Sequence, residues 1–136
     1  MKIRGKTVYV YDIEVFQNVF HCTLLNTETE KLIKYECSER KNNIEEMCNL
    51  FLTENAYFAG YNNHYDNPII NYCIEFFSNS KYTYSKICKS IFNLSNIITQ
   101  DKDDIDSWKR WKYAKNFLTL DLLTMLYSKA LRVSLK

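Results

Sequence analysis

Val8-Tyr-Val-Tyr-Asp12-Ile-Glu14-Val-Phe-Gln-Asn18 is the stretch that decides the expected fold of this chain. Its β-branched and aromatic residues follow the pattern of a β-strand, and that strand carries two acidic residues near its end. Residues two apart in a strand point to the same face, so the carboxylates of Asp12 and Glu14 share one side. Two like charges this close favour a divalent cation between them. The alternative interpretation is a pair of ordinary solvent-facing acids, and this stretch alone leaves both open.

The length and composition predict a single globular domain over residues 1–136. The hydrophobic fraction is 46% and the charged fraction 25%, which excludes a disordered chain. A net charge of +2 gives no argument for nucleic-acid binding by the molecule as a whole, so such binding must rest on local patches. The five cysteines contain no Cys-x-x-Cys pair and indicate reduced thiols of a cytoplasmic protein. No segment has the length and apolarity of a membrane span or a signal peptide, so no membrane partner is expected.

The remaining pattern predicts an α/β fold with a mixed sheet. Polar residues separate the first three expected strands by short intervals, which predicts an antiparallel three-stranded meander. The first of these strands is expected to lie centrally in the mixed sheet. Helices and strands then alternate. The expected strands after the opening one cover 19–26, 31–37, 56–60 and 116–120; the expected helices cover 43–52, a segment opening at Pro68, 87–98 and 122–131.

A second polar cluster follows the strand expected over 56–60. It contains Asn62, Tyr65 and Asp66, about fifty residues after the first acidic pair. The topology places the ends of these two strands side by side, so we expect Asp12, Glu14, Asn62 and Asp66 to converge on one edge of the sheet.

Taken together, the two clusters resemble the proofreading 3'-5' exonuclease domain of phage family B DNA polymerases, within the DEDD exonuclease superfamily. Asp12 and Glu14 match the first exonuclease motif, and Asn62, Tyr65 and Asp66 match the second. Leu120-Asp-Leu-Leu and Leu131-Arg-Val-Ser-Leu-Lys look like the elements that precede the third motif, so the resemblance covers nearly the whole chain. It implies an RNase H-like fold.

The resemblance also implies two-metal hydrolysis of phosphodiester bonds at single-stranded DNA ends. Asp12, Glu14 and Asp66 would be the catalytic carboxylates and the ligands of two Mg²⁺ or Mn²⁺ ions. Asn62 and Tyr65 would hold the 3'-terminal nucleotide, the amide by hydrogen bonding and the ring by packing.

The third exonuclease motif has no counterpart in this chain. That motif places a tyrosine four residues before a last aspartate, on a helix that would follow the region ending at Lys136. A single domain without the final helix of the family is therefore expected, with weak metal occupancy and poor or absent activity. Asp121 is either a substitute ligand or the cap of the last helix. We therefore expect either a piece of a longer polymerase or exonuclease, or a small phage protein that has kept the fold and lost the chemistry and that binds and inhibits a host defence nuclease or binds its nucleic acid.

Cations and aromatic residues alternate in Trp108-Lys-Arg-Trp-Lys-Tyr113, which is typical of surfaces that grip single-stranded nucleic acid. Lys109, Arg110 and Lys112 are the candidate contacts. Two other interpretations remain: the tryptophans pack on the core while the cations are solvated, or the segment is a protein-binding hot spot.

Overall fold

A computed structural model describes residues 1–61, 63–79, 81–100, 108–112 and 114–122. Over these residues the fold is α/β, with a mixed six-stranded sheet in the order β4-β3-β2-β5-β6 and β1 paired to β2. This confirms the predicted fold class. The strands are β1 Lys2–Ile3, β2 Lys6–Val15, β3 Phe20–Asn26, β4 Leu32–Cys37, β5 Ala56–Gly60 and β6 Leu118–Asp121.

The strand that carries the two acids, β2, lies in the middle of the sheet. It pairs antiparallel with β3, which pairs antiparallel with β4, so the predicted meander is confirmed. The predicted central position of β2 in the whole sheet is confirmed as well. On its other side β2 pairs in parallel with β5, and β5 pairs in parallel with β6. The sequence interpretation missed β1, which turns back onto β2 through Arg4 and Gly5 with positive φ angles of 53° and 79°. Two positive φ angles are what a two-residue hairpin turn of type I′ requires.

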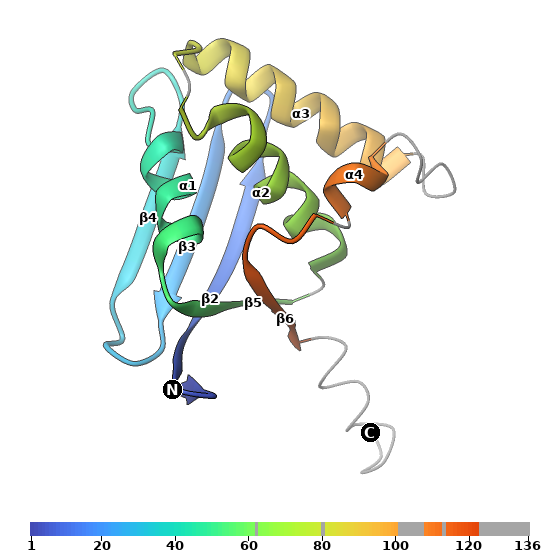
Figure 1. The fold of residues 1–136 in the computed structure, drawn as a ribbon. Helices are drawn as coiled ribbons and strands as arrows, with labels where there is room; N and C mark the ends of the chain where they lie inside the picture. Colours follow the sequence, from blue (N-terminus) through green and yellow to red (C-terminus); the bar gives the residue numbers. More distant parts are fainter. Residues whose placement is uncertain (62, 80, 101–107, 113, 123–136) are drawn as a thin grey trace, which may run out of the picture.

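The helices α1 (Ile44–Thr53), α2 (Asn63–Phe77) and α3 (Tyr84–Gln100) cover one face of the sheet, and the short α4 (Lys109–Lys112) packs on α2 (Figure 1). Alternation along β2 decides what meets them. Tyr9, Tyr11 and Ile13 point toward the helices and are buried in the core. Asp12 and Glu14 point to the opposite face of the sheet and are exposed. Burial of the odd-numbered residues therefore fixes the direction of both acids.

Helix α2 begins earlier than predicted. Pro68 was expected at the first helical position, but α2 starts at Asn63 and Pro68 lies inside it. Proline supplies no amide hydrogen for the helix, so the prediction was reasonable. The helix starts earlier because two side chains before Pro68 contact distant strands: Asn63 forms a hydrogen bond with β6 and Asn67 forms one with β2. These contacts stabilise the helical turn that precedes Pro68.

All five cysteines are free and buried. Among the helices described, none combines the length and the apolar character needed to cross a membrane. The loop predicted over 101–106 and the helix predicted over 122–131, apart from its first residue, lie outside the described residues.

Candidate functional site

Strands β5 and β6 end together, and α2 follows β5. Asp121, the last residue of β6, is paired with Gly60, the last residue of β5. On the other side of β5, strand β2 continues to Val15, past the last β5-paired residue, Val10. Ligands of α/β proteins bind at the carboxyl ends of parallel strands, which makes this end of the sheet the first place to look for a site.

Asp66 lies in the first turn of α2 and is buried, with 6% of its surface exposed. Its pKa is raised to about 7, first because burial disfavours the charged carboxylate and second because the charge of Asp12 repels it. The second cause indicates that Asp12 and Asp66, which come from segments far apart in the chain, are near enough for their charges to interact. Repulsion between two carboxylates of this kind is relieved when a cation binds between them.

Tyr11 interacts electrostatically with Asp12, Asp66 and Asp121. Burial raises the pKa of the Tyr11 phenol, and the charges of Asp66, Asp121 and Asp12 raise it further. All three carboxylates therefore act on one buried hydroxyl. Asp121 also acts on His64, where it opposes the lowering of the imidazole pKa by burial and by Lys112.

Glu14 lies two residues beyond Asp12 on the exposed face of β2. Its register partner on β3 is His21. The Nε2 atom of His21 lies 3.0 Å from Oε1 of Glu36 on β4, so the imidazole is engaged on that side of the sheet. Glu14 thus shares a face with Asp12, as predicted, and both acids lie on the face of β2 opposite the helix layer to which α2 and Asp66 belong.

Over the described ranges, no group of three or more His, Cys, Asp or Glu side chains is arranged to hold a metal ion. Carboxylate oxygens are the ligands that Mg²⁺ and Mn²⁺ prefer, and Asp66 is a buried carboxyl whose pKa is raised in part by the charge of Asp12. The predicted role of Glu14 as a third ligand stays a prediction.

Asn62 and Tyr65, the two residues predicted to hold a nucleotide, cannot both be located in the described part of the chain. Asn62 lies outside the described residues. The hydroxyl of Tyr65 is 2.7 Å from Oγ of Ser95, so its ring points to α3. That contact ties two helices together.

The basic segment forms α4 on the outer side of α2. Trp108 has only 1% of its surface exposed and packs edge-on against His64. Arg110 pairs with Glu75 at 3.2 Å, while the ammonium of Lys112 lies 5.4 Å from the centre of the Trp108 ring. The structure thus favours the interpretation in which a tryptophan packs on the core. Lys109 and Arg110 remain exposed, so their predicted contact with nucleic acid stays a prediction.

Two residues of the site escaped the sequence interpretation. Tyr11 donates a hydrogen bond to Oδ1 of Asn67, and Nδ2 of Asn63 donates to the carbonyl of Leu120 at 2.7 Å. The only local signal was a polar run after Gly60, which does not indicate which side chain reaches which strand.

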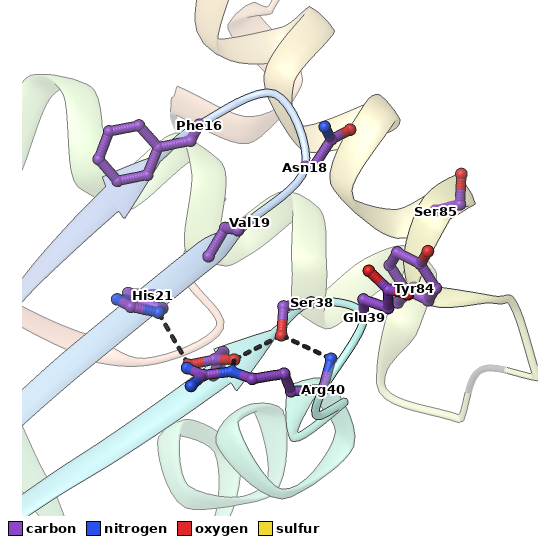
Figure 2. Close-up of a pocket in the computed structure, with 10 residues that line it drawn as sticks. Phe16, Asn18, Val19, His21, Ser38, Glu39, Arg40, Tyr84 and Ser85 are labelled. Carbon is purple, nitrogen blue, oxygen red and sulfur yellow. Dashed lines mark hydrogen bonds and ion pairs between the residues drawn. The ribbon is translucent and has the colours of Figure 1, made fainter.

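A hollow of about 620 Å³ lies elsewhere, between the β2–β3 turn, the end of β4 and the start of α3 (Figure 2). Glu36 is bonded to Arg40, Ser38 and His21, and these partners, Arg40 foremost, lower the pKa of its carboxyl to about 2. Ser38 and His21 both bond to Glu36 and not to each other, so they do not form a hydrolase triad.

No protein-family model matches the sequence, and no curated protein is significantly similar to it. The structure therefore defines an α/β domain in which the charge of Asp12, on the central strand, acts on the buried carboxyl of Asp66 at the start of α2.

Proposed function

We propose that this chain is an RNase H-like, exonuclease-related domain of the host-cell cytoplasm that binds the 3' end of single-stranded DNA through a divalent cation at Asp12 and Asp66. One observation supports the proposal most strongly. The carboxyl of Asp66 is buried in the first turn of the helix that follows β5, and the charge of Asp12 contributes to raising its pKa. A cation offsets that repulsion, and a phosphate can then complete its coordination.

Asp66 and Asp12 have different roles in this proposed function. Asp66, fixed on a helix, offers an oriented carboxylate, and Asp12 offers a second from the exposed face of β2. A bound Mg²⁺ or Mn²⁺ would supply charge neutralisation at the terminal phosphodiester. Two carboxylates hold one ion more readily than two, so binding exceeds hydrolysis and cleavage is slow.

The test uses a single-stranded oligonucleotide that carries a fluorophore at its 5' end. We expect Mn²⁺ to increase its affinity for the chain, as measured by fluorescence anisotropy, and Asp12→Ala to remove that increase. Glu46→Ala is the matched control, because Glu46 is an exposed acid on α1. Slow shortening of the oligonucleotide from its 3' end accompanies binding. Affinity that is independent of Mn²⁺, or equal in Asp12→Ala and Glu46→Ala, refutes the proposal.

A second candidate, an interaction protein that binds a host defence protein, is favoured by an aromatic cluster on α2 and α4. Tyr72 lies 4.9 Å from Phe76 and 5.1 Å from Trp111 between ring centres, and Arg110 lies over the Trp111 ring. Aromatic and arginine side chains dominate binding hot spots. This candidate predicts that Phe76→Ser, at a position 44% exposed, abolishes binding to a purified defence nuclease while Asp12→Ala preserves it.

A further inference from the structure

Five aromatic side chains from α2, α4 and the segment after α2 contact one another in a row, which we call the aromatic strip. They are Tyr72, Phe76, Phe77, Tyr82 and Trp111, and neighbouring rings lie 4.9–6.1 Å apart between centres. Phe77 is buried and anchors the strip to the core. Phe76 is 44% exposed and Tyr82 is 50% exposed, so the strip presents aromatic surface to solvent at two positions.

Positive charge accompanies the aromatic strip. The described residues 72–79, 81–82 and 108–112 contain four cations and one acid, a net charge of +3. The cations are Lys81, Lys109, Arg110 and Lys112. The acid, Glu75, is paired with Arg110 at 3.2 Å, and the same guanidinium lies 5.9 Å from the centre of the Trp111 ring. Lys81 and Lys109 are exposed, so their charges are available to an anionic partner.

We infer that the aromatic strip is a binding surface for single-stranded nucleic acid, where bases stack on Phe76 and Tyr82 while phosphates contact Lys81 and Lys109. A single strand fits both features, because its backbone is anionic and its bases have open faces, whereas a duplex encloses the faces of its bases. The inference goes beyond the proposed function, since this surface needs no metal ion. Phe76 also lies about 15 Å further along α2 than Asp66.

The test measures binding of a fluorescein-labelled oligothymidylate of about 15 nucleotides, by fluorescence anisotropy in EDTA. Phe76→Leu keeps an apolar side chain against Tyr72 and Trp111 but has no ring on which a base can stack. Phe16→Leu is the matched control, because Phe16 is 55% exposed and lines the hollow at the β2–β3 turn instead. Thermal unfolding records the stability of each variant.

We expect Phe76→Leu to weaken binding of the single strand about tenfold, the loss of one base–aromatic stack, and Phe16→Leu to leave it unchanged. The same oligothymidylate paired with oligoadenylate should bind both variants equally, because a duplex offers no open base face to the strip. Equal affinities of the two variants for the single strand overturn the inference, and that is the result expected of a surface that binds only a protein. A loss in Phe76→Leu that is as large for the duplex as for the single strand also overturns it.

Salt dependence tests the phosphate contacts. Lys109→Ala should reduce the slope of log affinity against log salt concentration by about 0.7, the value for one phosphate of a single strand. Lys41→Ala is the control, since Lys41 is an exposed lysine after β4, and it should leave the slope unchanged. Equal slopes in the two variants overturn the contact assigned to Lys109. Every measurement is made in EDTA, so this inference and the Mn²⁺-dependent binding proposed for Asp12 can fail separately.

Discussion

Replacing Gly60 by alanine tests the packing that holds the start of α2. An added Cβ atom would lie 1.9 Å from Oδ1 and 3.1 Å from Cγ of Asn63, well inside contact distance. Asn63 is 5% exposed and bonded to the carbonyl of Leu120, so its amide moves only by giving up that bond. The substitution therefore acts on the fastening of α2 to β6.

The expected cost has two parts. Overpacking a buried site costs about 1–3 kcal/mol, and loss of the hydrogen bond to Leu120 costs about 1 kcal/mol more. Gly60→Ala should accordingly lower the free energy of unfolding by about 2–4 kcal/mol and the Tm by roughly 10 °C. Gly5→Ala is the comparison, because Gly5 has nothing within 4 Å of the added atom and a φ of +79°. Its cost is backbone strain alone, about 1 kcal/mol.

Urea denaturation followed by circular dichroism measures both variants. The double variant Gly60→Ala with Asn63→Ala isolates the cause, since removing the Asn63 side chain empties the space that the new Cβ needs. We expect alanine at position 60 to cost under about 1 kcal/mol in that background. If Gly60→Ala is as stable as the unaltered chain, or costs as much with Asn63→Ala as without it, the steric argument is wrong.

Three further predictions concern charge and thiols. Because the Asp66 carboxyl has a pKa of about 7 in the fold and near 4 in unfolded chains, stability in EDTA falls as pH rises between these values; Asp66→Asn should raise the Tm at pH 8 and change it little at pH 4. Glu36 shows the opposite sign: its lowered pKa, about 2, gives stability that is lost as pH falls from about 4.3 through 2, and Arg40→Ala should raise that pKa in a carboxyl ¹³C NMR titration. All five thiols are buried and free, so Ellman's reagent should react with none of them quickly in the native protein and with all five in guanidinium; fast native reaction would contradict the described core.

The sheet was predictable because its signals are local. Alternation along β2, β3 and β4 and the short polar intervals between them indicated the meander, and four-three-four spacing of Ile87, Ile91, Leu94 and Ile98 indicated α3. The start of α2 was not predictable in the same way. Proline at position 68 is a strong local signal for a helix start, and contacts with distant strands override it.

The site was predictable only in part for the same reason. Topology alone indicated that Asp12 and Asp66 would approach each other, and the charge of Asp12 does contribute to raising the pKa of Asp66. The bond between Tyr11 and Asn67 spans 56 residues and leaves no periodic trace in the sequence. For the segment around Trp108, an exposed cationic helix and one whose tryptophan is buried have the same residue pattern, so only the 1% exposure of Trp108 distinguishes them.

The hydrogen bond from Asn63 to Leu120 joins residues 57 positions apart and depends on the last strand of the described sheet. During synthesis, β2, β5 and α2 leave the ribosome well before β6 does. Until β6 adds to the edge of the sheet, the Asn63 amide lacks its acceptor and Asp121 is absent from the strand ends. Closing so long a loop is a late event in folding. The start of α2 can therefore gain its contact with β6 only after the chain as far as Leu120 has left the ribosome.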